Sequence, residues 1–386
     1  MTERLPIAVE MIADLVAFDT ESSKSNLPII DFIAAHLEAR GVPYVRVPNA
    51  TGDKAAIFAT VGPMVDGGIV LSGHTDVVPV AGQAWTSDPF RLRRDGDRLY
   101  ARGACDMKGF DGTVLAMIDE FLAAPLVRPI HILLSYDEET TCLGPVDTIR
   151  RFGADLPRPA AVIVGEPTRM EVADAHKGVA TYITQVTGKE AHSSKPMLGA
   201  NAIEAACALV GEIYRVGGEL EAAADPANRF EPAWSTVSVG EIHGGTARNI
   251  LAKECRLHWE FRNLPGVAAG IALARVEEFA AREVLPKLRR YAPEASIITV
   301  TEVEVPALAP EPGSLAETLA LRLTRSNRTI AVPYATEAGR FQTAGIPTIV
   351  CGPGSIDQAH QPDEFIEIGQ IDSCIAFLRR LIGECV

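Results

Sequence analysis

Five side chains of types that bind metal ions follow short apolar segments of this sequence, where predicted strands end. They are His74, Asp106, Glu139, Glu166 and His360. In open α/β sheets, functional sites form at the carboxyl ends of the strands, so these five side chains can converge. Two histidines and three carboxylates suit a pair of divalent ions that share one carboxylate. A structural zinc site would normally use closely spaced cysteines instead.

Each motif also leaves a simpler interpretation open. His74 can belong to a surface turn, Asp106 can be the N-cap of the helix that follows it, and the run Asp137–Glu139 can be an acidic turn. Neighbouring side chains on an extended segment point in opposite directions, so two carboxylates of that run can face different parts of one cleft. The equivalent position of all five candidates favours the metal site.

Apart from the five candidate ligands, the sequence offers one supporting carboxylate and little evidence for other kinds of catalysis. Asp76 comes two residues after His74 and can fix the tautomer of a metal-binding imidazole. The motifs HExxH, GxSxG and GxxxxGK[ST] are all missing from the sequence. Cys105 could be a nucleophile, but the adjacent carboxylate of Asp106 would raise the pKa of its thiol, so we interpret Cys105 as a packing residue.

Composition excludes several classes of protein. The 386 residues include 36 Lys and Arg against 50 Asp and Glu, which gives a net charge of −14. This acidity, without any run rich in Lys or Arg, argues against a nucleic-acid partner. No apolar stretch is long enough to predict a membrane span, and charges near the N-terminus do not fit a signal peptide. The seven scattered cysteines predict reduced thiols in a cytoplasmic protein.

Alternating helical and strand patterns predict an α/β fold in three segments. Residues 1–177 and 303–386 form two parts of one domain, in which helices cover a sheet of buried strands. Residues 178–302 follow the order β-α-β-β-α-β of the ferredoxin-like split unit. We therefore expect a small domain inserted into a larger one.

Longer motifs around the candidate residues resemble a known family. They are Ser72–Pro79 (SGHTDVVP), Gly103–Gly109 (GACDMKG), Asp137–Glu139 (DEE), Gly165–Pro167 (GEP), Thr336–Gln342 (TEAGRFQ) and Cys351–Glu364 (CGPGSIDQAHQPDE). Over essentially the whole chain, the sequence resembles the co-catalytic di-zinc family of aminoacylases, deacylases and carboxypeptidases, and within it the branch that deacetylates acetylornithine. The resemblance implies a mixed-sheet, zinc-peptidase-like catalytic domain with an inserted ferredoxin-like lid and dimerisation domain.

The resemblance also implies how the five candidates bind two metal ions. His74, Asp106 and Glu166 would hold one zinc ion. Asp106, Glu139 and His360 would hold the other, so that Asp106 bridges the pair. Zinc is the expected metal, and cobalt is the alternative because oxygen and imidazole ligands suit several ions.

The implied reaction is the hydrolysis of N2-acetyl-L-ornithine to L-ornithine and acetate, a step of arginine biosynthesis. Two zinc ions would activate the attacking water, and Glu138 would be its general base. Asp76 would orient His74. Glu337 would pair with the δ-ammonium group of ornithine, and Asp363 and Glu364 are the alternatives for that contact.

The resemblance also implies a homodimer, formed through the inserted domain, that acts on a small N-acyl amino acid. His192 would reach the active site of the partner subunit and stabilise the oxyanion. Asn249 and Arg262 would bind the substrate carboxylate. Many relatives have Asp where this sequence has Glu260, two residues before Arg262.

Several alternatives remain open at this stage. Metal and base residues serve every acyl group alike, so the chain could be a succinyl-diaminopimelate desuccinylase, an acetylcitrulline deacetylase or a dipeptidase. It could also be a non-catalytic binding protein that kept the fold, although the complete ligand set argues against this. Without the resemblance, His192 could be an ordinary surface residue and Arg262 part of a surface ion pair.

Overall fold

The computed structural model describes residues 3–386, which form two compact units. Unit 1 comprises the chain up to Ala175 together with Leu308–Ala331 and Thr336–Val386. Unit 2 comprises His176–Ala307 and Val332–Ala335. Each unit has its own hydrophobic core. Among the described residues, no helix is long and apolar enough to cross a membrane, and all seven cysteines are unbridged.

Unit 1 is built on an eight-stranded mixed sheet with the order β1-β2-β6-β3-β7-β14-β8-β13. Its strands are β1 (Tyr44–Pro48), β2 (Ala55–Val61), β3 (Ile69–His74), β6 (Ile130–Ser135), β7 (Ala161–Pro167), β8 (Ala173–His176), β13 (Ile330–Val332) and β14 (Thr348–Gly352). Strand β3 pairs in parallel with β6 and β7, and β14 pairs in parallel with β7. Four neighbouring strands therefore end at the same edge of the sheet.

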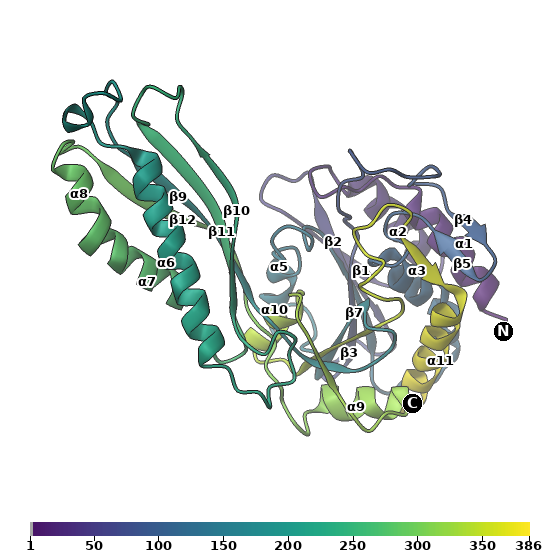
Figure 1. Cartoon of the computed structure of the whole chain (residues 1–386). Helices are drawn as coiled ribbons and strands as arrows, with labels where there is room; N and C mark the ends of the chain where they lie inside the picture. Colours follow the sequence, from purple (N-terminus) through teal and green to yellow (C-terminus); the bar gives the residue numbers. More distant parts are fainter. Residues whose placement is uncertain (1–2) are drawn as a thin grey trace. The chain divides into compact units, whose positions relative to one another are not determined.

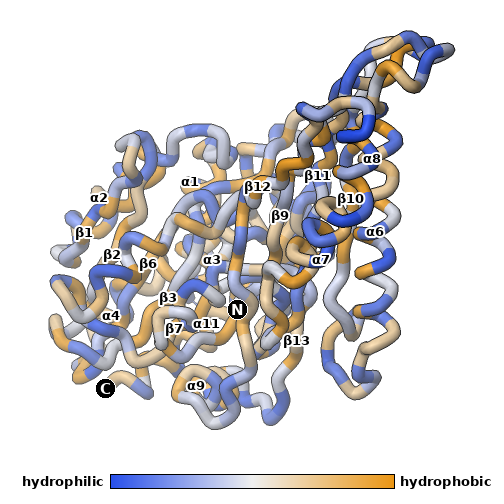
Figure 2. The backbone as a smooth tube through the Cα atoms, turned by 90° about the vertical axis from the view of Figure 1, so that its left-hand side faces the viewer, coloured by the Kyte–Doolittle hydropathy of each residue, from blue (hydrophilic) through white to orange (hydrophobic). Residues whose placement is uncertain are grey.

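The central strands are apolar along nearly their whole length because both faces of the sheet are covered. Every residue of β2, β3, β6, β7 and β14 is buried, and β3, β6 and β7 are largely hydrophobic segments in Figure 2. Figure 1 shows α3 and α11 on one side of this sheet and α5 and α10 on the other. The helices of unit 1 are α1 (Leu5–Val16), α2 (Leu27–Glu38), α3 (Lys108–Ala116), α4 (Ile118–Ala123), α5 (Val146–Ile149), α9 (Leu315–Thr324), α10 (Ala338–Thr343) and α11 (Ile368–Cys385).

A small second sheet in unit 1 joins the middle of the chain to its C-terminal part. It contains β4 (Arg93–Asp95), β5 (Arg98–Tyr100) and β15 (Phe365–Glu367), in the order β15-β5-β4. The segments on either side of this sheet carry Asp106 and His360. The small sheet thus brings two of the candidate ligand segments close to each other.

Unit 2 is a four-stranded antiparallel sheet with helices on one face. Its elements are β9 (Val179–Thr187), the 3₁₀ turn η1 (Pro196–Leu198), α6 (Ala202–Ala222), β10 (Thr236–Gly244), β11 (Glu254–Arg262), α7 (Ile271–Phe279), the π-helical turn η2 (Ala280–Val284), α8 (Leu285–Arg289) and β12 (Ser296–Val305). Burial alternates residue by residue along β9 and β11, as expected for a sheet with one covered face. The strand order β10-β11-β9-β12 and the chain order β-α-β-β-α-β are those of a ferredoxin-like unit.

The predicted fold class is confirmed. Unit 1 contains the large mixed α/β sheet, and segments from both ends of the chain contribute strands to it. The helix that follows Asp106 is interrupted at Met117 and forms α3 and α4.

Candidate metal centre

The four parallel strands β6, β3, β7 and β14 place most of the candidate ligands at one edge of the sheet. His74 is the last residue of β3, and Glu166 is the last residue but one of β7. Glu139 lies in the turn that follows β6, and His360 lies in the segment that follows β14. Asp106 comes just before α3. The strand ends meet because the strands are parallel neighbours, as the sequence pattern predicts.

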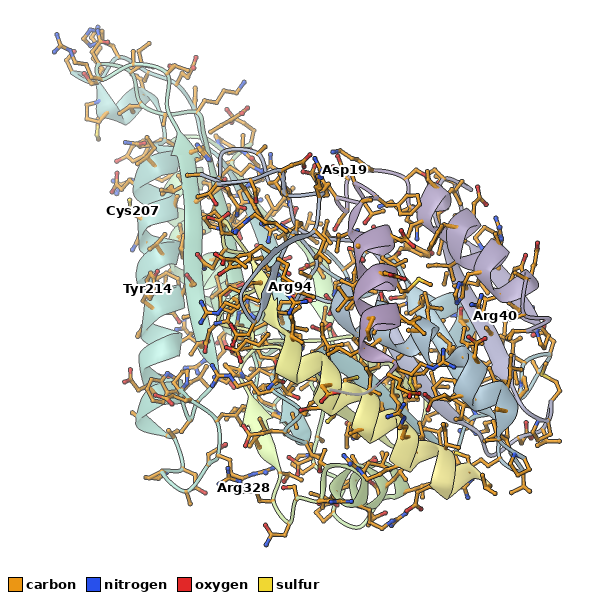
Figure 3. The ribbon with its side chains drawn as sticks, turned by 90° about the vertical axis from the view of Figure 1, so that its right-hand side faces the viewer. Asp19, Arg40, Arg94, Cys207, Tyr214 and Arg328 are labelled. Carbon is orange, nitrogen blue, oxygen red and sulfur yellow. The ribbon has the colours of Figure 1, made fainter. Side chains whose placement is uncertain are left out.

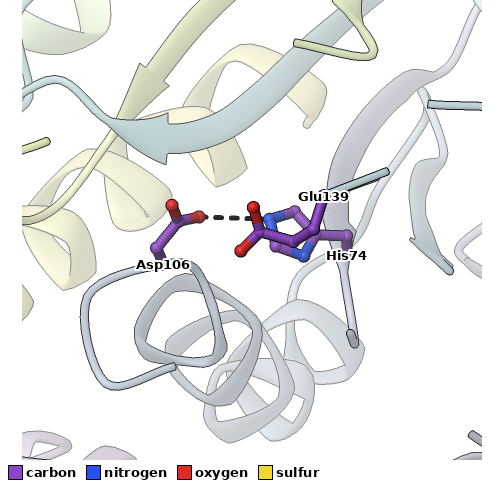
Figure 4. Close-up of side chains that lie close together, drawn as sticks. All are labelled: His74, Asp106 and Glu139. Carbon is purple, nitrogen blue, oxygen red and sulfur yellow. Dashed lines mark hydrogen bonds and ion pairs between the residues drawn. The ribbon is translucent and has the colours of Figure 1, made fainter. Parts of the chain in front are cut away.

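Asp106 lies between two histidines, and each of its carboxylate oxygens faces one of them. The Nε2 atom of His74 is 3.1 Å from Oδ1, and the Nε2 atom of His360 is 3.3 Å from Oδ2. Figure 4 shows Asp106 and Glu139 beside the His74 ring. Glu166 Oε1 lies 3.5 Å from His74 Nε2, and Glu139 Oε2 lies 3.0 Å from His360 Nε2. The structure therefore brings all five candidate ligands together.

The donor set fits divalent cations. His74, Asp106 and Glu139 offer ligand atoms within 4.8 Å of one another, and so do His74, Glu138 and Glu166. Among the described residues, the buried atoms Glu139 Oε1 and Glu166 Oε1 accept no hydrogen bond. Buried carboxylate oxygens normally find a partner, so these two atoms are expected to face a bound cation.

Electrostatics supports this fit. Burial, reinforced by the charge of Asp106, raises the pKa of Glu166 to about 8 and that of Glu139 to about 7. Burial also raises the pKa of Glu138 well above its usual value. Hydrogen bonding with the carboxylates of Asp106 and Glu139 raises the pKa of His360 to about 11. Crowded buried carboxylates of this kind are stabilised when a divalent cation neutralises them.

Asp76 organises the centre through both its backbone and its side chain. The backbone carbonyl of Asp76 accepts a hydrogen bond from Nδ1 of His74 at 2.9 Å, which directs Nε2 of the ring toward Asp106 and Glu166. The carboxylate of Asp76 lies 3.5 Å from the same Nδ1 atom. It accepts hydrogen bonds from the backbone N–H groups of Glu138 and Glu139 and from the hydroxyl of Ser22. Asp76 thus orients the His74 ring and also fastens the turn that carries Glu138.

Glu337 lies beneath the centre and not on its surface. Its side chain is fully buried, and its two oxygens accept hydrogen bonds from the hydroxyls of Ser72 at 2.5 Å and Ser135 at 2.7 Å. This corrects the expectation that Glu337 binds the substrate ammonium group, because a buried carboxylate with both oxygens occupied is not available to a ligand. Of the two alternatives, Glu364 is also buried, and Asp363 is partly exposed.

His192, Asn249 and Arg262 belong to unit 2, whereas the five ligand candidates belong to unit 1. His192 is exposed, and its Nδ1 atom accepts a hydrogen bond from the backbone N–H of Ser194 at 3.2 Å. A neutral His192 therefore carries its proton on Nε2. The backbone carbonyl of Asn249 accepts a hydrogen bond from Ser193 N–H at 2.9 Å.

Arg262 forms a two-point ion pair with the residue that departs from the family pattern. Its Nε and Nη2 atoms donate to the carboxylate of Glu260 at 2.9 Å and 3.3 Å. Both side chains are about one-third exposed. Glu260 therefore orients the guanidinium group within unit 2.

The sequence interpretation did not identify the supporting role of three residues near the centre. Ser22 carries no sequence signal, because it is a single serine outside any motif. Arg102 precedes the motif Gly103–Gly109, and Glu364, which the sequence suggested only as an alternative contact for the substrate ammonium group, ends the motif Cys351–Glu364. Their proximity to those motifs is the only signal that could have pointed to them.

The structure places two histidines and several carboxylates at the strand ends of a mixed α/β sheet, an arrangement that fits a pair of divalent cations. Residues 70–384 match the model of peptidase family M20/M25/M40. The chain belongs to this family and is a hydrolase.

Full-length relatives agree with this assignment. The chain is 33% identical over 394 residues to the acetylornithine deacetylase of Pasteurella multocida, with 99% of each chain covered. It is 34% identical to the acetylornithine deacetylase of Yersinia pestis, over 100% of this chain and 98% of the relative. These relatives confirm the resemblance to the acetylornithine deacetylase branch and do not support a non-catalytic binding protein.

Solved structures share the fold at low sequence identity. An aminopeptidase from Bacillus cereus matches with a TM-score of 0.75 and 18% identity, over 99% of this chain and 98% of the other. A metallo-carboxypeptidase of the M20 family from Sulfolobus solfataricus matches with a TM-score of 0.74 and 17% identity, over 99% of both chains.

Proposed function

We propose that this protein hydrolyses the amide bond of N2-acetyl-L-ornithine and releases L-ornithine and acetate, a step of arginine biosynthesis. The observation that carries the proposal is the position of Asp106, whose two oxygens face His74 and His360 on opposite sides. Full-length relatives that are named acetylornithine deacetylase favour this substrate.

Two divalent ions are proposed to be held by the chain. One would be held by His74, Asp106 and Glu166, and the other by Asp106, Glu139 and His360. Zinc is the expected metal, and cobalt is the alternative. When bound, such ions polarise the amide carbonyl and lower the pKa of the attacking water toward neutrality.

Glu138 is proposed as the general base. Its carboxylate lies near His74, with Oε2 3.9 Å from Nε2. Burial raises the pKa of Glu138 well above its usual value, which suits a group that must accept a proton near neutral pH. The side chain would take a proton from the attacking water and deliver it to the departing amine. Asp76 supports this role because it holds the backbone of the same turn.

Residues of unit 2 are proposed to complete the site. His192 carries a proton on Nε2 when neutral, so it can donate a hydrogen bond to the tetrahedral oxyanion. Arg262 offers a planar guanidinium group suited to the substrate carboxylate, and Asn249 is proposed beside it. The proposed arrangement is a homodimer in which His192 serves the partner subunit.

The outer surface of unit 2 supports self-association. Strand β10 is an edge strand, and unpaired edge strands readily pair with another chain. Figure 3 shows Cys207 and Tyr214 on the outer side of α6. Tyr214 is 50% exposed, and Ile242 of β10 is 48% exposed.

Light scattering of the purified protein would measure the oligomeric state. Mixed dimers of His192→Ala and Glu138→Gln protomers should regain activity, and inactive mixed dimers would contradict the shared site.

The decisive experiment compares substrates with purified, zinc-loaded protein. The proposal predicts that kcat/KM is higher for N2-acetyl-L-ornithine than for N-acetylcitrulline, N-acetylmethionine, N-succinyl-diaminopimelate or simple dipeptides. The Glu138→Gln variant is the control for contaminating hydrolases. A higher kcat/KM for any other substrate in the panel would contradict the proposed substrate but not the assignment as a hydrolase.

The cellular location is proposed to be the cytoplasm. The acidic charge and the unbridged cysteines fit this location.

A further inference from the structure

A buried ion pair lies beside the proposed metal centre. Arg102 and Glu364 are each 1% exposed, and Nη1 of Arg102 donates to Oε2 of Glu364 at 2.7 Å. The two residues are far apart in the sequence, and each borders a different ligand segment. Arg102 precedes Asp106, and Glu364 follows His360.

Glu364 fastens the backbone that leads to Asp106. Its Oε2 accepts a hydrogen bond from Gly103 N–H at 3.1 Å, and its Oε1 accepts from Cys105 N–H at 2.8 Å and from Asp106 N–H at 3.0 Å. One carboxylate therefore satisfies three backbone donors of a single tight segment. Hydrogen bonds to an ionised acceptor are stronger than neutral ones, so this segment is held firmly.

Arg102 fastens the segment that carries His360. Its Nη1 also donates to the backbone carbonyl of Gln361 at 3.4 Å, and its Nη2 donates to Oε1 of Gln83 at 2.5 Å. Gln83 in turn donates from Nε2 to the backbone carbonyl of His360 at 2.9 Å. Arg102 therefore acts on the His360 backbone through Gln83 and through the next residue of the chain.

The His360 segment needs this support because its backbone is strained and its side chain is exposed. His360 has φ of 61° and Asp363 has φ of 55°, both in the left-handed region that disfavours residues other than glycine. The side chain of His360 is 50% exposed, whereas that of Asp106 is 5% exposed. A histidine on such a segment keeps its position only where surrounding contacts determine it.

We propose that Arg102 and Glu364 are positioning residues that hold the Asp106 and His360 segments at the separation required to share one divalent ion. This proposal rests on the proposed metal binding by Asp106 and His360. It assigns the pair a role in cation affinity and not in the chemical step, because neither side chain lies on the proposed reacting atoms.

Two single variants and their combination test the proposal. Glu364→Gln replaces the carboxylate with an amide of the same shape, which can no longer accept hydrogen bonds on both sides. Arg102→Met removes the guanidinium group and keeps an apolar side chain. Glu120→Gln is the matched control in the same unit, because Glu120 pairs with Arg379 and Arg4 and is not among the residues of the centre.

The measurement is the zinc bound by full-length protein at fixed free zinc concentrations, determined by mass spectrometry, together with Tm in chelator. Residues that support metal ligands typically contribute 10–100-fold to metal affinity. We expect each single variant to need about 10–100-fold more free zinc for full loading, while Glu120→Gln matches the unchanged protein.

The double variant separates positioning from stability. Arg102→Met with Glu364→Gln leaves no buried unpaired charge, so its Tm in chelator should exceed that of at least one single variant. Its zinc affinity should stay low, because the ties between the two segments are still missing. Zinc affinity that recovers together with Tm would overturn the proposal, and so would single variants with unchanged zinc affinity.

A milder variant keeps the proposal testable where the others do not fold. Arg102→Lys keeps the charge but cannot contact Glu364 and Gln83 together, so we expect an intermediate loss of zinc affinity. Unchanged affinity would contradict the proposal. Zinc is measured without substrate, so an unmodified protein that binds two ions but does not cleave N2-acetyl-L-ornithine would contradict the proposed substrate alone. An unmodified protein that binds no zinc would contradict the proposed function and the positioning role together.

Discussion

His74 and His131 are both fully buried and lie on neighbouring parallel strands of one sheet, but their surroundings are opposite. His74 ends β3. Although burial works against a charged imidazole, the carboxylates of Asp106, Asp76 and Glu166 raise the pKa of His74 well above its usual value.

His131 is the second residue of β6 and lies near the other end of the strands. Its ring stacks on Phe58 with centroids 5.0 Å apart, and its Nδ1 is 2.9 Å from the hydroxyl of Thr60. Among the described residues, its Nε2 atom has no partner. Burial lowers the pKa of His131 to about 4. Equal burial therefore says little about function, and position along the strand says much more.

If the carboxyl ends of the strands carry the chemistry, Glu138→Gln should have the largest effect. We expect kcat to fall by about 10²–10⁴-fold, because the amide cannot accept a proton from water. Both metal ions should be retained, and mass spectrometry of the purified variant would check this. A variant that loses zinc would instead place Glu138 among the ligands.

Removal of metal should destabilise the protein because contacts at the carboxyl ends of the strands, near His74, are lost. His131 should not contribute to this effect. At free zinc 100-fold above the dissociation constant, binding of one ion stabilises the folded state by about 2.7 kcal/mol. Urea denaturation with and without chelator would measure this difference. The His131→Gln variant should show the same difference as the unchanged protein. A smaller difference in His131→Gln would contradict the contrast between the two ends of the strands.

Acidification should destabilise the protein through the protonation of His131. The pKa of His131 is about 4 in the folded state and about 6.5 in an unfolded chain. The unfolded state therefore binds more protons between these values, and stability is lost as pH falls from about 6.5 toward 4. At pH 5 the loss from this residue is about 2 kcal/mol.

The measurement is the free energy of unfolding at pH 7 and pH 5, in chelator, for the unchanged protein and for His131→Gln. The variant should lose less stability on acidification than the unchanged protein does. Equal losses would show that His131 is protonated without cost in the folded state.

The smallest expected effect concerns the support of Asp76. The Ser22 hydroxyl donates to Asp76 Oδ2 at 2.7 Å in a buried position. Ser22→Ala should reduce the free energy of unfolding by about 1 kcal/mol, because two backbone N–H groups still hold the carboxylate. Ser373→Ala, which removes an exposed hydroxyl of α11, is the control and should have almost no effect. An effect of Ser22→Ala equal to that of Ser373→Ala would show that this hydrogen bond does not hold Asp76.

Much of the fold could be predicted because local pattern determines it. Short apolar runs identified the buried strands β3, β6 and β7. The chain order β-α-β-β-α-β in unit 2 followed from the same patterns. The break at Met117 between α3 and α4 was not predicted, because the apolar periodicity continues through it.

The types of residue in the candidate centre and their places at strand ends are properties of the sequence alone. Parallel strands must end at a common edge, so the pattern was sufficient to bring His74, Glu139 and Glu166 together. The residues that hydrogen-bond to this centre and support it were decided by the tertiary structure. The serine hydroxyls that occupy Glu337, the tie from Ser22 to Asp76 and the Arg102–Glu364 pair join residues about 50 to 265 positions apart. Contacts over such separations depend on how the chain packs, and no local pattern records which side chains that packing leaves buried, paired or open to a ligand.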